Sequence, residues 1–275
     1  MGKKMREIIF ILTTRCNQKC SFCCEPQSQD DFSFEYAKYC IDAVSKNNIE
    51  WIDLSGGEPL LHKNIVDIVE YSCKKKLKTT LSTNGLILDN FYPDLKHKIS
   101  QWNLSLHGLK ETHNKIVNNK NSYDKIIKAC EVLVSENQIV HITYVVTRQN
   151  VTEIQNIMKI MGAIGVQKIC FNYVFRRGNG QKYISDSDYS FDYLYKLTKE
   201  YSEKVKDIIV YHNYNYDGQC LLLRSNGSIW AVPLSNKYDY KEVSTIDSLN
   251  DLVKNYMFLD NHLKFQEKRL MEIIR

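Results

Sequence analysis

The sequence lacks any apolar run long enough to cross a membrane. A membrane-spanning helix needs about 18 consecutive apolar residues, whereas the stretch IIFIL near the N-terminus is far shorter. This stretch is also shorter than the core of a secretion signal, and no cleavage site of small residues follows it. These absences predict a cytoplasmic protein that has no membrane partner.

Low-complexity segments, internal repeats and a strong excess of one charge are absent as well. The net charge is +5, and 43% of the residues are hydrophobic and 25% charged, which is typical of a globular protein. The densest basic cluster, CKKKLK at 73–78, joins a predicted helix to a predicted strand, and cations suit a helix end. Nucleic acid is therefore not the expected partner, and 275 residues can bury a core without disulfides.

Cysteine, in contrast, is plentiful. The chain has nine cysteines, and an odd number in a cytoplasmic protein favours free thiols or metal ligands over disulfides. Four of them lie between residues 16 and 24, in the stretch TTRCNQKCSFCCEP. Four others lie singly in apolar or helical stretches and are interpreted as small core residues: Cys40, Cys73, Cys130 and Cys170.

Strand-like and helical patterns alternate over the first two thirds of the chain. The strand-like runs are 6–13, 49–55, 77–82, 102–106, 139–147 and 168–175. Helical patterns separate them, and two of these patterns follow Ser33 and Ser122, which are interpreted as N-caps. Six strand-then-helix units predict an α/β fold with a parallel sheet, helices on its outer face, and functional loops at the carboxyl ends of the strands.

The pattern changes after about residue 184. Residues 185–206 and the stretches 246–257 and 259–274 read as helices. Residues 207–214 and 219–233 read as short strands, with a hairpin turn at SNGS. We therefore expect two domains, a core of residues 1–183 and a small α/β appendage of residues 184–275 that shapes the substrate pocket.

Three of the clustered cysteines follow a C-x3-C-x2-C spacing. Cys16, Cys20 and Cys23 can wrap one loop around a single centre, which suits a soft metal or an iron–sulfur cluster. Zinc is the alternative, but structural zinc sites use four ligands in two separated pairs, and no second pair follows downstream. Three ligands leave one position open for a small molecule. Cys24 could be a fourth ligand, but adjacent side chains in an extended loop point apart, so it is assigned to packing or to a position next to the ligands.

A glycine pair follows the second predicted strand, in WIDLSGGEPLL. Gly56 and Gly57 have no side chain, so the backbone can approach a ligand closely there. Glu58 adds a carboxylate and Pro59 stiffens the exit from the turn. This loop is the neighbour of the cysteine-containing loop in the predicted sheet.

Together these motifs resemble those of radical S-adenosylmethionine (SAM) enzymes. The stretches that carry the resemblance are CNQKCSFC, GGEP after the second strand, STNG after the third, and LSLHGLKETHNKI at the fourth. The resemblance covers about residues 5 to 183 and implies a partial (β/α)6 barrel related to TIM barrels.

The resemblance also implies the cofactors and their ligands. Cys16, Cys20 and Cys23 would hold three irons of a [4Fe–4S] cluster, and SAM would bind the fourth. An external one-electron donor of the flavodoxin or ferredoxin type would reduce the cluster, and SAM would yield a 5′-deoxyadenosyl radical that takes hydrogen from a substrate. The residues implied to contact SAM are Phe22, Gly56, Gly57, Glu58, Ser82, Asn84 and Ser105.

The chain departs from the family pattern at the fourth strand. His107 replaces an aspartate, and Val117 stands where an arginine is usual. Anchoring of the SAM carboxylate then needs another cation, and Lys115 and Arg148 are both left open. His107 is interpreted as a histidine whose ring is satisfied by backbone.

A second departure lies in the appendage, which resembles a SPASM or twitch extension. Such extensions hold auxiliary clusters through several cysteines, but here only Cys220 remains, and Pro233-Leu234 replaces a Pro-Cys step. We expect the scaffold of the extension without its metal.

The resemblance leaves the substrate and the catalytic residues open. A ribosomal peptide is the first expectation because of the SPASM-like region, and a small metabolite or nucleotide is the alternative. A non-catalytic iron–sulfur redox sensor would explain the cysteines but not the GGEP loop. Release of 5′-deoxyadenosine distinguishes an enzyme from a sensor.

Overall fold

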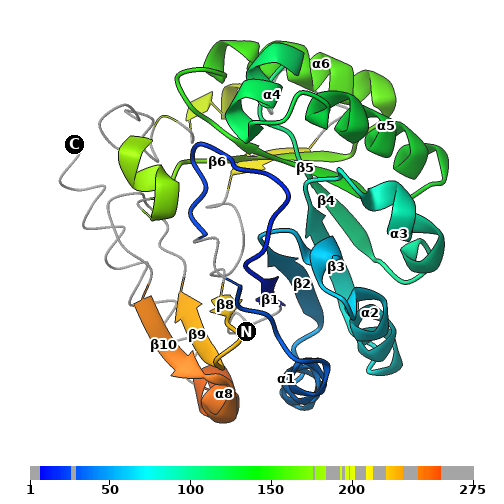
Figure 1. The fold of residues 1–275 in the computed structure, drawn as a ribbon, viewed down its shortest axis with the longest axis vertical. Coiled ribbons are helices and arrows are strands. Elements are labelled where there is room, and N and C mark those ends of the chain that lie inside the picture. Colours follow the sequence, from blue (N-terminus) through cyan, green and yellow to red (C-terminus); the bar gives the residue numbers. More distant parts are fainter. Residues whose placement is uncertain are drawn as a thin grey trace.

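A computed structural model describes residues 7–25, 29–175, 177–183, 193, 196–197, 199–201, 209–212, 221–231 and 241–254 (Figure 1). Its strands are β1 (Glu7–Thr13), β2 (Trp51–Gly56), β3 (Lys78–Thr83), β4 (Gln101–Ser105), β5 (Val140–Val145), β6 (Lys168–Asn172), β7 (Ile209–His212), β8 (Leu221–Leu223), β9 (Ser228–Ala231) and β10 (Lys241–Thr245). Its α-helices are α1 (Phe34–Lys46), α2 (Ile65–Lys74), α3 (Leu88–Leu95), α4 (Lys110–Val117), α5 (Ser122–Ser135), α6 (Ile154–Ile164) and α8 (Leu249–Lys254).

The strands form one sheet in the order β10-β9-β8-β1-β2-β3-β4-β5-β6-β7. Strands β1 to β6 pair in parallel, one after another, which confirms the predicted α/β fold with six parallel strands. The helices lie around the outside of this curved sheet (Figure 1).

The C-terminal strands extend both edges of the same sheet. Strand β7 pairs in parallel with β6, and β8 pairs in parallel with β1. Strands β8 and β9 form the hairpin predicted at SNGS, where Gly227 has a φ of 84°. The predicted helix 185–206 lies largely, and 259–274 entirely, outside the described residues, and α8 is the described part of 246–257. The division into two domains at residue 183 stays a prediction.

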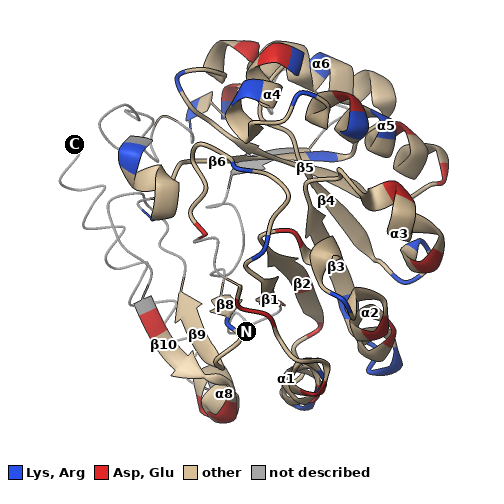
Figure 2. Ribbon diagram, viewed as in Figure 1, with Lys and Arg blue, Asp and Glu red and all other residues tan. Residues whose placement is uncertain are grey.

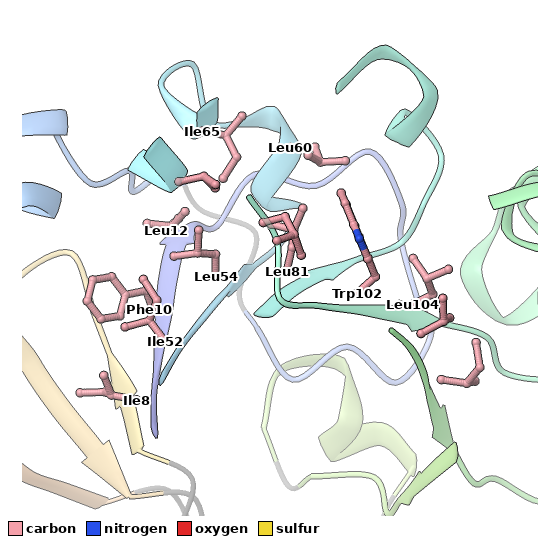
Figure 3. Packing of buried hydrophobic residues seen from close by; sticks show 14 of the residues in the cluster. Ile8, Phe10, Leu12, Ile52, Leu54, Leu60, Ile65, Leu81, Trp102 and Leu104 are labelled. Atoms are coloured by element: carbon pink, nitrogen blue, oxygen red, sulfur yellow. The ribbon is translucent and has the colours of Figure 1, made fainter. Parts of the chain in front are cut away.

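The two faces of the sheet differ in chemistry because successive strand residues point to opposite sides. The residues that face the helices are apolar and form the core together with helical side chains (Figure 3). They include Ile8, Phe10, Leu12, Ile52, Leu54, Leu81, Trp102, Leu104, Ile142, Tyr144, Ile169 and Phe171.

The inner, concave face is polar along β2 to β6. The strand registers bring polar residues of neighbouring strands together on this face. They are Asp53, Thr80, Ser82, Asn103, Ser105, His141, Thr143 and Asn172. A polar concave face can hold a polar ligand, whereas the apolar outer face is filled by helices.

Two sequence expectations about helices differ from the structure. Ser33 caps α1 as predicted, because its side chain accepts the Tyr36 N–H. Ser122 is instead the first residue of α5, and the N-cap of this helix is Asn121. Cys73 was expected in the core but is exposed, since it lies just beyond the buried stripe of α2 that ends at Ser72.

Charged residues of both signs are interspersed over the helices (Figure 2). Within the described ranges, no helix is both long enough and apolar enough to span a membrane.

Candidate active site

The cysteine loop, residues 14–33, joins β1 to α1 and is described except for 26–28. Its two ends pair with each other. The Thr14 N–H donates to the Asp30 carbonyl at 3.0 Å, and the Asp30 N–H donates to Thr14 Oγ1 at 3.1 Å. The Arg15 guanidinium binds the Asp31 carboxylate at 2.6 Å. The closed base leaves the middle of the loop free to reach across the concave side of the sheet.

The end of α4 holds the middle of the loop. The Lys19 N–H donates to the Val117 carbonyl at 3.3 Å, and the Ser21 N–H donates to the Ile116 carbonyl at 2.9 Å. The last carbonyls of a helix have no partner within the helix. The cysteine loop therefore satisfies the end of α4 and is fixed by it.

The loop after β6 holds the cysteine loop from the other side. The Asn179 N–H donates to the Cys23 carbonyl at 2.8 Å, and Asn179 Nδ2 donates to the Cys20 carbonyl at 3.3 Å. Gly178 has a φ of 58°, and a Cβ there would lie 2.6 Å from the Cys23 carbonyl oxygen. A glycine is thus required for this close contact.

The three spaced cysteines are free and half-buried on this loop. Burial raises the pKa of Cys16 to about 11, although hydrogen bonds from the Gln18 N–H and Asn84 lower it. Burial also raises the pKa of Cys20 and of Cys23, and for Cys20 the neighbouring thiolates add to the effect. Because metals bind cysteines as thiolates, a cationic centre bound here would lower these pKa values.

The three thiols do not form a site for a single metal ion in this structure. No group of three or more His, Cys, Asp or Glu side chains among the described residues could hold one metal ion. In a [4Fe–4S] cluster each thiolate binds a different iron, so the sulfurs need not converge on one point. The assignment of Cys16, Cys20 and Cys23 as the three thiolate ligands of such a cluster stays a prediction.

The glycine pair packs directly on the start of the cysteine loop. The Gly57 N–H donates to the Thr13 carbonyl at 2.7 Å, and the Glu58 N–H donates to the Arg15 carbonyl at 2.8 Å. A Cβ at Gly56 would lie 2.2 Å from the Thr13 oxygen, and one at Gly57 would lie 2.2 Å from the Arg15 oxygen. Side chains would push the two loops apart, so the glycines fix the position of the cysteine loop. Contact of either glycine with SAM stays a prediction.

Glu58 ties the loops after β2 and β3 together. Its side chain is fully buried, and Oε1 accepts from the Leu60 N–H at 3.0 Å and from Thr83 Oγ1 at 2.8 Å. Oε2 accepts from the Asn84 N–H at 2.8 Å. Burial raises the pKa of Glu58 to about 7, although these hydrogen bonds lower it. The carboxylate therefore orders Asn84, and its predicted contact with SAM stays untested.

Two other predicted residues lie at the carboxyl ends of their strands. Asn84 Nδ2 donates to Asn17 Oδ1 at 2.7 Å and to Cys16 Sγ at 3.8 Å, so the loop after β3 reaches the cysteines. Ser105 ends β4, and its half-buried hydroxyl has no protein partner among the described residues. Ser82 lies deeper, where its hydroxyl binds Asp53. Contacts of these three residues with SAM stay predictions.

The comparison with protein families agrees with this geometry. The sequence profile of the Radical SAM superfamily matches residues 10–161, which is more than half of the chain. The chain belongs to the radical SAM superfamily. Proteins of this superfamily use a [4Fe–4S] cluster and SAM, so the predicted family and cofactors are confirmed.

Curated relatives and solved structures of radical SAM proteins extend over much of the chain. Fe-coproporphyrin III synthase of Methanosarcina barkeri is 26% identical over 212 residues, covering 74% of this chain and 50% of the relative. The antilisterial bacteriocin subtilosin biosynthesis protein AlbA of Bacillus subtilis is 28% identical over 180 residues, covering 62% and 40%. The chain thus spans about half the length of these relatives or less.

The fold is also similar to that of Streptococcus suis SuiB bound to the precursor peptide SuiA. The TM-score is 0.74 at 16% identity, and the match covers 91% of this chain and 65% of SuiB. At this identity the likeness concerns the fold alone.

His107, one of the departures from the radical SAM pattern, faces the cysteine loop. The Phe22 and His107 rings meet edge to face, with centroids 4.8 Å apart. His107 Nδ1 accepts from the Val145 N–H at 3.1 Å, as expected for a ring satisfied by backbone. Burial holds the pKa of His107 well below its usual value, so the ring is neutral and carries its proton on Nε2. Lys115 and Arg148 are both exposed, and the carboxylate anchor stays open.

One contact of the cysteine loop was not indicated by any motif in the sequence. Gln18 Nε2 donates to Ser122 Oγ at 2.8 Å, and this oxygen also lies 2.8 Å from His113 Nε2. All three side chains are buried. The Ser122 hydroxyl, which the sequence predicted as a helix cap, therefore connects the cysteine loop to α4. Ser122 and Gln18 are 104 residues apart in the sequence.

A second unpredicted contact joins the cysteine loop to the β8–β9 hairpin. Arg224 donates from Nη1 to Glu25 Oε2 at 2.7 Å and from Nη2 to Glu25 Oε1 at 2.9 Å. The two side chains are only 13% and 10% exposed. Cys220 and Pro233-Leu234 lie outside the described residues, so the expected absence of an auxiliary cluster stays a prediction.

Proposed function

We propose that this protein is an enzyme that cleaves SAM reductively and removes a hydrogen atom from a substrate. The observation that carries the proposal is the loop of three half-buried thiols, held by α4, by the loop after β6 and by the glycine loop after β2. When bound, the [4Fe–4S] cluster supplies the electron that splits SAM into methionine and a 5′-deoxyadenosyl radical. An external flavodoxin or ferredoxin type donor would supply that electron.

The residues of the chain bind and orient the cofactors. Cys16, Cys20 and Cys23 hold the cluster, and Asn84 is kept beside Cys16 by the buried Glu58 carboxylate. The edge-to-face pair of the Phe22 and His107 rings borders the same loop. Because the thiols must stay reduced, we expect the protein to act in the cytoplasm.

A peptide is the first candidate for the substrate. AlbA is named for the biosynthesis of the bacteriocin subtilosin, and the SuiB structure contains a precursor peptide. A small metabolite is the alternative, supported by the relative named Fe-coproporphyrin III synthase. Both candidates share the first step, which is therefore tested first.

The test measures 5′-deoxyadenosine. Protein reconstituted anaerobically with iron and sulfide is reduced with dithionite and mixed with SAM, and the product is quantified by liquid chromatography with mass spectrometry. We expect product from the wild type and from Cys73→Ala, an exposed cysteine far from the loop in sequence. The triple variant of Cys16, Cys20 and Cys23 to Ala should form none. A wild type with a full cluster and bound SAM but no product would contradict the proposal and favour a redox sensor.

A further inference from the structure

A row of hydrogen-bonded side chains crosses the concave face of the sheet below the cysteine loop. Asp53 of β2, Ser82 of β3, Asn103 of β4 and Thr143 of β5 form this row, which we call the polar belt. Ser82 Oγ lies 2.8 and 2.9 Å from the two Asp53 oxygens, Asn103 Nδ2 lies 2.9 Å from Ser82 Oγ, and Thr143 Oγ1 lies 2.8 Å from Asn103 Oδ1. The belt spans four neighbouring strands.

The hydrogen bonds of the polar belt all run in one direction. Thr143 donates to the Asn103 carbonyl oxygen, and the Asn103 amide donates to the Ser82 oxygen. Ser82 therefore has its own proton left for Asp53. The positive ends of the three dipoles point toward Asp53, so the belt favours a carboxylate that accepts hydrogen bonds.

The Asp53 carboxyl group, at the end of the belt, has few hydrogen-bond donors and no cation beside it among the described residues. Asp53 is 9% exposed, and a hydroxyl carries one proton, so Ser82 can fully serve only one of its two oxygens. In the described part of the chain Asp53 has no ion-pair partner. Buried charges in proteins are normally paired. Burial, with the nearby Glu7 carboxylate as a second cause, holds the pKa of Asp53 well above its usual value.

A second unsatisfied group lies beside Asp53. Thr80 is the register partner of Asp53 on β3, and only 2% of its surface is exposed. Its hydroxyl Oγ1 is buried and has no hydrogen-bond partner among the described residues. Buried polar atoms without partners are rare in folded proteins. The Asp53 carboxylate and the unpartnered Thr80 hydroxyl therefore lie side by side on the same face of the sheet.

Three side chains of the belt keep part of their surface exposed. The side chains of Ser82, Asn103 and Thr143 are half-buried, in contrast to the fully buried residues on the opposite face of the same strands. The belt lies on the same side of the sheet as Ser105, at the carboxyl end of β4. A substrate that reaches down from the cysteine loop would meet it.

We propose that Asp53, with Thr80 and the polar belt, binds an ammonium or guanidinium group of the substrate and selects cationic substrates. This inference rests on the proposed function, because it assigns a specificity site to the substrate of that reaction. For a peptide substrate, the recognised group is a lysine or arginine side chain or a free amino terminus. A cation beside Asp53 would favour the charged form of this carboxyl group and pair with it.

The test compares a charged probe with a neutral probe of the same shape. Binding of Nα-acetyl-arginine methylamide and of Nα-acetyl-citrulline methylamide is measured by isothermal titration calorimetry, with and without SAM. Citrulline replaces the guanidinium with a neutral urea group. We expect the arginine probe to bind wild type about tenfold or more tightly than the citrulline probe, the preference expected of a charge-assisted contact.

Isosteric variants locate the contact. Asp53→Asn should lose the tenfold preference, and Thr80→Val should weaken the arginine probe alone by about threefold, as expected for a neutral hydrogen bond. The matched control is Asp42→Asn, a carboxylate on α1 that pairs with Lys75 at the surface. It should bind both probes like the wild type. Iron content and melting temperature are measured on each variant to confirm that the fold is intact.

Several results would overturn the inference. They are equal binding of the two probes by wild type, no binding of either probe, and an unchanged preference in both Asp53→Asn and Thr80→Val. If Asp53→Asn does not fold, Thr80→Val and the wild-type preference still decide. Probe binding is read independently of SAM cleavage, so a failure of the proposed function appears as missing 5′-deoxyadenosine and not as a missing preference.

Discussion

Replacing Arg224 by Met should detach the β8–β9 hairpin from the cysteine loop and destabilise the protein. The guanidinium binds Glu25 through two hydrogen bonds of 2.7 and 2.9 Å. Bidentate arginine–carboxylate pairs are among the strongest hydrogen-bonded contacts in proteins. Methionine keeps much of the apolar bulk but removes the charge, so the Glu25 carboxylate remains buried without its cation.

The size of the effect follows from the burial of the pair. Breaking a buried ion pair by removing one partner costs about 3 to 5 kcal/mol. Because Glu25 and Arg224 keep about a tenth of their surface exposed, we expect the lower end, about 3 kcal/mol. For a protein of this size each kcal/mol shifts the melting temperature by about 2 to 4 °C, so the expected decrease is about 6 to 12 °C.

The assay is thermal unfolding of the metal-free protein under reducing conditions, followed by far-ultraviolet circular dichroism. The control is Lys125→Met, which removes the partner of Asp89 from a pair whose side chains are 45% and 58% exposed. Such exposed pairs contribute about 1 kcal/mol or less. A double-mutant cycle with Glu25→Gln isolates the pair energy. Equal shifts for Arg224→Met and Lys125→Met would refute the reasoning.

Three further predictions concern the site. Cys24→Ala should keep its iron and sulfide content, whereas loss of iron comparable to that of Cys16→Ala would make Cys24 a ligand. Gly57→Ala places a Cβ 2.2 Å from the Arg15 carbonyl oxygen, so it should lose about 3 kcal/mol of stability and most of its iron uptake; an unchanged melting temperature would contradict this. Glu58 has a folded-state pKa of about 7, above that of the unfolded chain, so its contribution is fully present at low pH and is lost as pH rises toward 7, by about 1.4 kcal/mol per unit at most. Urea unfolding between pH 4.5 and 7 should show this decline for wild type but not for Glu58→Gln, and parallel pH profiles would show that Glu58 does not titrate in this range.

The alternation of strands and helices was predictable because the spacing of apolar residues within each segment indicates its secondary structure. Strands β1 to β6 lie within the predicted runs or extend them by one residue, and Ser33 caps α1 as expected. Ser122 was misassigned because its hydroxyl has a tertiary partner, Gln18, that competes with the cap. Cys73 was misassigned because its place in a helical stretch does not show that it lies outside the buried stripe of that helix.

The sequence shows the polar face of each strand, but the polar belt can be predicted only once the strand order is known. Asp53, Ser82, Asn103 and Thr143 each stand between two buried apolar or small residues in a strand. This period of two indicates a polar face in each strand separately. Which polar residues meet depends on the register between strands, and a slip of one residue would turn each of them to the outer face.

By itself, the sequence determined the ligand spacing of Cys16, Cys20 and Cys23, the glycine pair and the order of strands and helices. These features depend on neighbours within a few residues, where covalent geometry and hydrophobic periodicity act directly. Only the tertiary structure decided that the glycines approach protein backbone, that Glu58 is buried between two loops, and that Glu25 meets Arg224. The last pair is 199 residues apart, and β8 brings Arg224 to the cysteine loop by pairing beside β1. A contact across such a separation is set by sheet order and register, which no local pattern encodes.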